Sequence, residues 1–429
     1  MTHVHIIHAP GDLDALLAVH EALRREGMPD DYETRPGQGP KIEDAFAVIV
    51  LLSQDSVRSA EVKRDVEQAR GLGLPLIAYR IDKARLGSFF RPVFSEADLI
   101  HADEPDALGR LLDAVKDRYK RRCPVVAVMN LKGGVGKTTI ASQVFGAYQA
   151  ERANRVLLID LDPQYNLTQT FLDIDVADDS ALADRSVISL FEKSRLHSAG
   201  APSPGEHWDR LSTEPFNPPR REALVHALLG DDGPDGRLDL VSGQFEISKY
   251  AFASDPAALH EIKANFLRIL DHYRSAYDLI VIDTNPNATF LTRATLAAAD
   301  RVVAPMHADA YSLRGVKLLN QVITNQVSDG DRPALSVLFN AVGRNEQSTF
   351  EADTRNGVYD GQAGFALSKA VMEHAVPRSG HLVVKSIDPD APRPPYQQLV
   401  AHTGRGGGLK RIRESLAAVA LEVERLSQA

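Results

Sequence analysis

The chain has 429 residues, of which 44% are hydrophobic and 25% charged, and its formal net charge is −9. This composition is typical of a globular protein and excludes a disordered, collagen-like or coiled-coil chain. A single cysteine, Cys123, excludes an internal disulfide framework and indicates a reducing compartment. The acidic balance excludes a wholly basic nucleic-acid coat, although it does not exclude a local basic patch.

Neither a membrane span nor a signal peptide is predicted. The longest apolar run, residues 45–52, has eight residues, whereas a transmembrane helix needs about 20. The N-terminus, MTHVHIIHAPGD, lacks a basic segment followed by a long apolar one. We therefore expect a cytoplasmic protein.

Residues 1–122 are predicted to alternate between short strands and helices. Apolar runs predict three strands, at 4–8, 45–52 and 74–79. Helical periodicity predicts three helices, at 12–26, 57–70 and 107–120. Strands that alternate with helices pair in parallel, so we expect an α/β domain with a flavodoxin-like sheet. The basic run RYKRR at 118–122 marks the junction with the second half.

The alternation of strands and helices restarts at residue 123. Further strands are predicted at 125–129, 155–160, 238–241, 279–283, 301–305 and 335–340. Several of them end in Asp or Asn, and open parallel sheets bind ligands at the carboxyl ends of their strands. Residues 193–236 contain six prolines and five glycines and are predicted to be an insertion. The second domain, 123–429, is thus predicted to hold a parallel sheet flanked by helices.

A glycine-rich loop follows the strand at 125–129. It consists of Lys132, Gly133, Gly134, Val135, Gly136, Lys137, Thr138 and Thr139. Between a strand and a helix, such a loop aims backbone N–H groups and the positive end of the helix dipole at a phosphate. We expect Lys137 to reach the β- and γ-phosphates and the Thr138 hydroxyl to coordinate Mg²⁺. Leu131 replaces the first glycine of the usual pattern, and Lys132 adds a second lysine.

Two further segments place carboxylates directly after buried strands. Asp160 and Asp162 lie in VLLIDLDPQ, and Asp283 ends the strand LIVID. One of the first two can hold Mg²⁺ through water while the other positions the attacking water, and Asp283 would lie near the metal. The alternative for each aspartate alone is a helix cap. Their order after a phosphate loop favours a nucleotide site.

The segments NLKGGVGKTT, VLLIDLDPQYNLT and YDLIVIDTNPNATFLT resemble the ParA/MinD family of deviant Walker A ATPases, and the ParA branch most closely. The resemblance covers about residues 123–428 and implies a P-loop NTPase fold that binds ATP and Mg²⁺. It further implies that Lys132 reaches across an ATP-bound homodimer to the partner's nucleotide. In this resemblance Asp162 positions the attacking water and Asp160 lies near Mg²⁺.

The same resemblance implies adenine contacts from Asn340 and from the pair Pro377 and Arg378. The chain departs from the family after Asp283, where Thr284-Asn285-Pro286-Asn287 stands in place of two prolines. This departure concerns the switch behaviour and the choice of partner more than nucleotide binding.

Residues 1–122 resemble a TIR (Toll/interleukin-receptor) domain. The resemblance lies in HIIHAPGDLDA, in the loop at 37–40, in IEDAFAVIVLLSQDSV and in GLPLIAYRID. It implies self-association, and some TIR domains cleave NAD⁺ with a glutamate. Asp65 stands at that position, with Glu61 and Glu67 out of register. Because a shorter carboxylate does not reach the same point, we expect an interaction module rather than an NAD⁺ hydrolase.

Members of the ParA branch commonly bind DNA without sequence preference, through Lys and Arg side chains against phosphate. The candidates here are Arg405, Lys410, Arg411 and Arg413, at the start of the last predicted helix. The alternative for each of them is a solvated helix face. The RYKRR junction is a second candidate, with a solvated spacer as its alternative.

The favoured hypothesis is an ATPase that acts as a dimerising molecular switch for the partition or positioning of DNA or a protein cargo. Its expected partners are a second copy, non-specific DNA and an adaptor or centromere-binding protein, and its expected location is the cytoplasm and the nucleoid. One alternative is an anti-phage defence or signalling protein in which the ATPase controls NAD⁺ hydrolysis by the TIR-like domain. Another is a nucleotide-dependent binding platform with negligible turnover.

Overall fold

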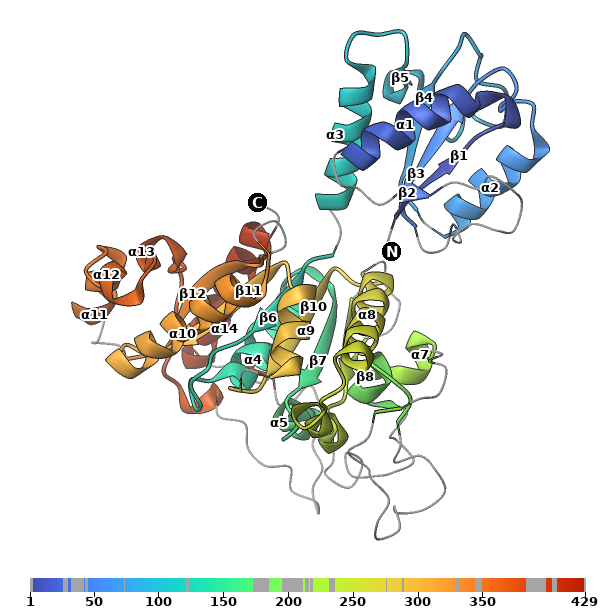
Figure 1. Cartoon of the computed structure of the whole chain (residues 1–429). Helices are drawn as coiled ribbons and strands as arrows, with labels where there is room; N and C mark the ends of the chain where they lie inside the picture. Colours follow the sequence, from blue (N-terminus) through green and yellow to red (C-terminus); the bar gives the residue numbers. More distant parts are fainter. Residues whose placement is uncertain are drawn as a thin grey trace. The chain divides into compact units, whose positions relative to one another are not determined.

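The described residues divide between two compact units, Met1–Arg122 and Cys123–Ala429, drawn in Figure 1. The computed structural model describes residues 3–25, 30–31, 42, 45–72, 74–120, 123–172, 185–194, 211–212, 216, 219–230, 236–274, 276–287, 289–328, 332–343, 349–382, 399–402 and 407–427. Within these residues, no helix combines the length and the apolar character that crossing a bilayer requires.

The first unit contains a five-stranded sheet in the order β2-β1-β3-β4-β5. Its strands are β1 (His3–Ile7), β2 (Asp30–Asp31), β3 (Ala45–Leu52), β4 (Leu76–Arg80) and β5 (Ile100–His101). All of its strand pairs are parallel, and the order is that of flavodoxin-like sheets. The predicted α/β class of this unit is therefore confirmed.

Helices cover both faces of this sheet. They are α1 (Leu13–Arg25), α2 (Ala60–Gly71) and α3 (Ala107–Lys120). Side chains of β3 alternate between the faces: Ile49 packs with α1 and α3, and Val50 packs with α2. The helix predicted from residue 57 begins at Ala60, because the Ser59 side chain accepts a hydrogen bond from the Val62 N–H and caps it.

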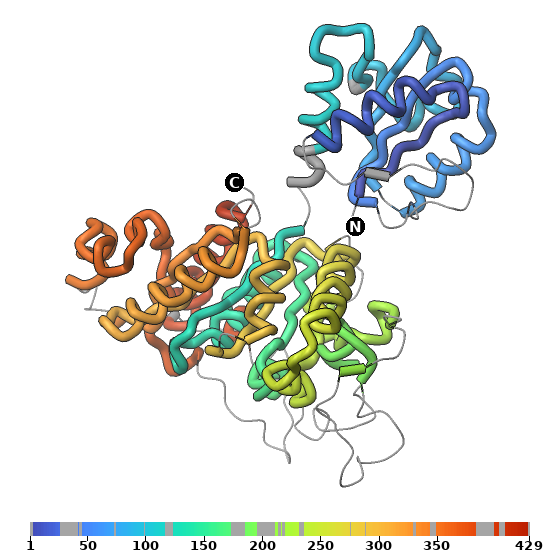
Figure 2. The backbone as a smooth tube through the Cα atoms, viewed as in Figure 1, coloured from blue at the N-terminus to red at the C-terminus, as the bar shows by residue number. Residues whose placement is uncertain are grey.

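The second unit contains an eight-stranded sheet in the order β13-β12-β11-β6-β10-β7-β9-β8. Its strands are β6 (Val125–Val128), β7 (Arg155–Leu161), β8 (His226–Leu229), β9 (Arg237–Val241), β10 (Leu279–Thr284), β11 (Arg301–Met306), β12 (Ala334–Val342) and β13 (Val376–Pro377). Figure 2 follows the backbone through its alternating strands and helices. The pairs are parallel except that β8 runs antiparallel to β9, and the predicted α/β class is again confirmed.

Part of the segment 193–236, which is predicted to be an insertion, forms regular secondary structure. Residues 226–229 form the edge strand β8, preceded by the short helix α7 (Arg221–Leu224). The sequence does not predict this strand, because prolines and glycines surround it and because the short run HALL has no alternation of apolar and polar residues. Residues 195–210 lie outside the described part of the chain.

Two helical layers enclose the second sheet. The longer helices are α4 (Lys137–Arg152), α8 (Pro256–Tyr273), α9 (Phe290–Ala298), α10 (Ala310–Gln326) and α14 (Gly407–Ser427), and the shorter ones are α5 (Asn166–Phe171), α11 (Thr349–Arg355), α12 (Asp360–Ala363) and α13 (Leu367–Ala370). α4 and α14 pack on one face, and α8, α9 and α10 pack on the other. In Figure 1, α8 and α9 lie in front of the sheet.

Gly236 provides a test of the turn that leads into β9. Its φ of +72° lies in the left-handed region, and a Cβ there would overlap the carbonyl group of Ala153. We expect Gly236→Ala to lower the free energy of unfolding by about 2–4 kcal/mol, through backbone strain and overpacking. Urea unfolding followed by circular dichroism measures the change. Gly361→Ala, where nothing lies within 4 Å, is the control, and equal midpoints for the two variants would contradict this packing.

Candidate nucleotide-binding site

The loop between β6 and α4 curls tightly around the start of the helix. Gly134 and Gly136 have φ values of +72° and +90°, a region that glycine enters at little cost. Gly136 is the N-cap of α4, and a Cβ there would overlap the side chain of Asn340. The first N–H groups of α4 therefore face an open site, where an anion would satisfy them.

Lys137 is held inside this loop. Its side chain is buried, and its Nζ donates to the carbonyl oxygen of Lys132 at 3.5 Å. Burial lowers the pKa of Lys137, and the charges of Asp283 and Asp162 offset part of this shift. A phosphate in the loop would supply the nearby negative charge that a buried ammonium requires.

Asp160 and Asp283 lie opposite each other on the neighbouring strands β7 and β10. Asp160 accepts hydrogen bonds from the Thr168 N–H at 2.8 Å and the Thr168 hydroxyl at 2.7 Å. Its other oxygen accepts from the Asp162 N–H at 3.2 Å. Despite these donors, complete burial raises the pKa of Asp160 to about 7. The site therefore holds one carboxylate in fixed orientation beside a second one.

Asp283 is completely buried, and neither of its oxygens has a hydrogen-bond partner among the described residues. Burial raises its pKa well above the usual value, the charge of Asp160 adds to this shift, and the Thr138 hydroxyl offsets part of it. Two carboxylates and a hydroxyl are the oxygen donors that Mg²⁺ prefers. The residues present therefore fit a divalent cation at this point.

A tight turn after β7 carries Asp162. Its carboxylate accepts from the Gln164 N–H at 3.0 Å, and its carbonyl oxygen accepts from the Tyr165 N–H at 2.8 Å. Tyr165 has a φ of +42°, in the left-handed region that side chains other than glycine rarely adopt. This turn leads directly into α5 and holds Asp162 beside the metal-ligand candidates.

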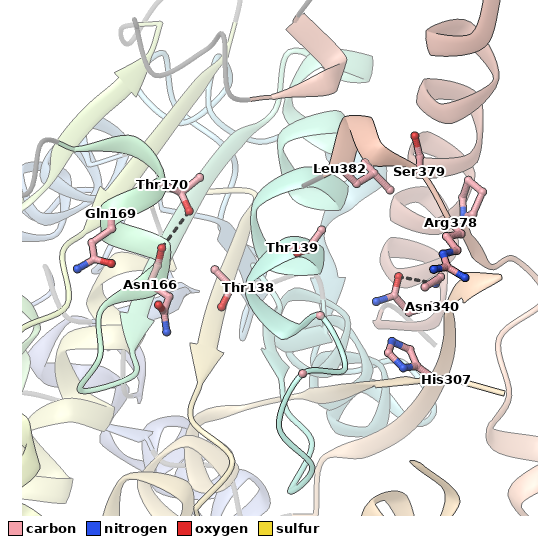
Figure 3. Close-up of a pocket in the computed structure, with 14 residues that line it drawn as sticks. Thr138, Thr139, Asn166, Gln169, Thr170, His307, Asn340, Arg378, Ser379 and Leu382 are labelled. Atoms are coloured by element: carbon pink, nitrogen blue, oxygen red, sulfur yellow. Dashed lines mark hydrogen bonds between the residues drawn. The ribbon is translucent and has the colours of Figure 1, made fainter. Parts of the chain in front are cut away.

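A cavity of about 600 Å³ opens in front of the phosphate loop, a size within the range of small-ligand sites. Its lining residues are Gly134, Gly136, Thr138, Thr139, Asn166, Gln169, Thr170, His307, Asn340, Ala341, Pro377, Arg378, Ser379 and Leu382. In Figure 3, Thr138 and α5 residues lie on one side of the start of α4, and His307, Asn340 and Arg378 lie on the other. Four residues of the predicted phosphate loop, Gly134, Gly136, Thr138 and Thr139, thus line one cavity with the three predicted adenine contacts, Asn340, Pro377 and Arg378. Gly133, Val135 and Lys137 are not among its lining residues.

Asn340 has a contact that the sequence did not suggest. Its Nδ2 donates to the carbonyl oxygen of Val135 at 2.7 Å, and its Oδ1 accepts from the Ala341 N–H at 2.9 Å. The amide therefore ties the end of β12 to the phosphate loop. An adenine contact from Asn340 stays a prediction, and it would use the second N–H of Nδ2 or the second lone pair of Oδ1.

Sequence reasoning missed several lining residues, namely Asn166, Gln169, Thr170, His307, Ser379 and Leu382. One signal could have identified His307, which directly follows the carboxyl end of β11, where parallel sheets bind their ligands. Ser379 and Leu382 come to the cavity only through the packing of the segment after β13, and no local pattern marks them.

Lys132 does not line the cavity of its own chain. Its Nζ donates to both carboxylate oxygens of Asp309, at 3.2 and 3.3 Å, and to the Ser312 hydroxyl at 2.9 Å. Asp309 is the N-cap of α10. The second lysine of the loop thus points to the first turn of another helix rather than to the cavity.

The DNA-binding candidates at the C-terminus differ in exposure. Arg405 lies outside the described residues. Lys410 and Arg411 are exposed at the start of α14, with Lys410 3.9 Å from Glu414. Arg413 is half-buried and its Nε donates to the Val400 carbonyl oxygen at 2.9 Å. Arg413 therefore has a structural contact, whereas Lys410 and Arg411 extend into solvent.

In the first unit, the candidate carboxylates lie along α2. Asp65 is half-buried there, and Glu61 and Glu67 are exposed. The loop at 37–40 lies outside the described residues.

Comparisons with known proteins concern the second unit. Residues 123–208 and 225–337 match the family model AAA_31, an AAA domain. The chromosome-partitioning ATPase Soj of Thermus thermophilus is 33% identical over 213 residues, which make up 50% of this chain and 66% of that protein. The sporulation initiation inhibitor protein Soj of Bacillus subtilis is 28% identical over 205 residues, 46% of this chain and 64% of that protein.

Among solved structures, that of pNOB8 ParA matches with a TM-score of 0.50 at 19% identity, covering 71% of this chain and 98% of that one. This likeness concerns the fold, a parallel sheet that carries a phosphate loop after β6. Together with the loop KGGVGKTT and the carboxylates at the ends of β7 and β10, the sequence matches show that the second unit belongs to the ParA/MinD family of P-loop ATPases.

Proposed function

We propose that this protein is an ATP-dependent switch that binds ATP with Mg²⁺, dimerises in that state and hydrolyses ATP to release the dimer. The observation that carries the proposal is the pair of buried carboxylates Asp160 and Asp283, opposite each other in register and beside the start of α4. Neither oxygen of Asp283 has a hydrogen-bond partner among the described residues by bond geometry. The nearby Thr138 hydroxyl and Lys137 ammonium offset its raised pKa only in part, so its burial favours a bound divalent cation.

Each part of the site has a role in this proposal. The N–H groups at the start of α4 and the Lys137 ammonium would bind the phosphates of ATP. Thr138, Asp160 and Asp283 would hold Mg²⁺, which neutralises charge that develops on the phosphoryl group. Asp162, fixed by its turn, would orient the attacking water. Pro377 and Arg378 line the same cavity and would contact the base.

The direction of Lys132 supports an assembly of two copies. Its ammonium points away from the cavity of its own chain, toward Asp309. An ammonium that is turned away from the cavity of its own chain is available to an anion on another molecule. We therefore propose that Lys132 contacts the nucleotide of a partner copy.

The relatives support a role in partition. The Thermus thermophilus relative is named as a chromosome-partitioning ATPase. We propose that the dimer positions DNA or a protein cargo, binds DNA non-specifically through Lys410 and Arg411, and uses an adaptor or centromere-binding protein. These exposed cations belong to a short patch on an otherwise acidic chain with a net charge of −9.

The first unit would act as a TIR-like interaction module. Leu13 and Leu17, one helical turn apart on α1, are each 51% exposed. Neighbouring apolar side chains on a helix surface are suited to contact a second copy or a partner protein. We therefore propose self-association through this unit.

We expect Lys137 to act in ATP binding and Lys132 to act in dimerisation and turnover. Lys137→Ala should weaken ATP binding about 10- to 100-fold, because it removes a charge-assisted hydrogen bond to phosphate. Lys132→Ala should bind ATP with unchanged affinity and lose ATP-dependent dimerisation and turnover. Nucleotide titration and analytical ultracentrifugation measure the two effects. Equal loss of ATP binding in both variants would contradict the role of Lys132 in a partner's site.

Asp162→Ala should lower kcat about 10²- to 10⁴-fold, the range of general acid–base contributions, while ATP binding and the ATP-dependent dimer persist. Phosphate release under single-turnover conditions measures the step. Gln164→Ala is the matched control, since this exposed side chain lies in the same turn and only its backbone N–H contacts Asp162. Turnover in Asp162→Ala that equals the parent rate would exclude Asp162 as the water-positioning residue.

The DNA patch is tested by a salt series. Replacing Lys410 and Arg411 by Ala should reduce the slope of log affinity against log salt by about 2 per protomer, at about 0.9 per neutralised phosphate. Filter binding with ATP present, from low to physiological salt, measures the slope. Arg425→Ala, in the last turn of the same helix, should leave it unchanged. An unaltered slope in the double variant would place DNA binding elsewhere.

A further inference from the structure

Lys132 is held in a three-way contact at the start of α10. Its Nζ lies 3.2 and 3.3 Å from the carboxylate oxygens of Asp309 and 2.9 Å from the hydroxyl oxygen of Ser312. A lysine ammonium has three N–H donors and no acceptor. Three acceptors therefore surround it, and a phosphate can bind this ammonium only by displacing some of them.

The backbone around Lys132 is fixed as well. Its N–H donates to Asn130 Oδ1 at 2.9 Å, and Asn130 Nδ2 donates to the carbonyl oxygen of Pro305 at 2.7 Å. Gly315 of α10 packs over this point, since a Cβ there would lie 2.6 Å from Asn130 Oδ1 and 3.1 Å from Lys132 Cβ. At Gly315, α10 thus packs its backbone directly against the side chains of Asn130 and Lys132.

Hydrogen bonds stabilise the ionised form of the Asp309 carboxylate. It accepts from the Ser312 N–H at 2.7 Å and from the Ser312 hydroxyl at 3.0 Å. Partial burial opposes ionisation of this group, but the Ser312 N–H, Lys132 and the Ser312 hydroxyl together lower its pKa below the usual value. The partner of Lys132 is therefore a fixed anion at a helix N-terminus.

We propose that Asp309 and Ser312 are positioning residues that hold Lys132 within its own chain, in competition with the nucleotide phosphate of a partner copy. This inference rests on the proposed function, since it assigns the regulation of the same site. The carboxylate of Asp309 occupies the place that an anionic phosphate oxygen would take. When the dimer forms, each Lys132 exchanges the carboxylate of Asp309 for the nucleotide phosphate of the partner copy.

The strength of this contact predicts the size of its effect. The side chains of Lys132 and Asp309 are 31% and 37% exposed, and ion pairs at such sites change an equilibrium by about 1.5- to 5-fold. A dimer contains two such contacts, so the factor enters its dissociation constant squared. Removing Asp309's charge should therefore tighten the ATP-dependent dimer by about 2- to 25-fold.

Asp309→Asn is the variant of choice, because Asn caps a helix as well as Asp does and has nearly the same size. It removes the charge and replaces one of the two acceptor oxygens by an NH2 donor. Sedimentation of the full chain with ATP and Mg²⁺ measures the dimer dissociation constant. We expect tighter dimers in Asp309→Asn and a smaller change in the same direction in Ser312→Ala. An unchanged or weaker dimer in Asp309→Asn would overturn the proposal. Glu414→Gln, an exposed acid on α14, is the control for a general effect of charge.

A second measurement separates this inference from the proposed function. In the nucleotide-free protein, labelling of Lys132 by an amine-reactive reagent, read by mass spectrometry, should be several-fold faster in Asp309→Asn than in the parent. Labelling of Lys410 is the internal reference. Equal rates at Lys132 would contradict the contact whether or not ATP causes dimerisation. A parent protein that does not dimerise with ATP contradicts the proposed function, while the labelling still decides the contact.

Discussion

The pairing of β10 between β6 and β7 is the constraint on which the rest of the site depends. In this register Asp283 lies opposite Val128 on one side and Asp160 on the other. One parallel sheet thereby brings the phosphate loop, both buried carboxylates and the turn of Asp162 to the same edge. The groups come from three strands, β6, β7 and β10, and the shared direction of the strands makes them neighbours.

This arrangement has a cost in free energy. Two buried carboxylates lie beside each other, and burial raises the pKa of both. The charge of Asp160 adds to the shift of Asp283, and the charge of Asp162 adds to that of Asp160. Asp160 receives three hydrogen bonds in compensation, whereas Asp283 receives none from the described residues. Groups that are destabilising without a ligand are stabilised when a cation binds. The pair of buried carboxylates therefore destabilises the fold locally and, for the same reason, favours the binding of a cation.

The contacts of the loop connect the site to two distant segments. Asn340 ties the phosphate loop to β12, and Lys132 ties it to the first turn of α10. Gly315 allows α10 to approach the loop closely. The phosphate loop is thus in direct contact with the end of β12 and with the first turn of α10. Figure 1 shows α10 beside β11 and β12.

Local patterns in the chain predicted the longer strands, most helices and the phosphate loop, and they marked Lys137, Thr138, Asp160, Asp162 and Asp283 as candidate site residues. These features follow from short-range rules, since apolar runs, glycines and carboxylates after strands are read within about ten residues. Tertiary structure alone decided the edge strand β8, the lining by His307, the partner of Asn340 and the pairing of Lys132 with Asp309, which is separated from it by 177 positions. Such contacts depend on the order of strands in the sheet, and no local pattern encodes that order.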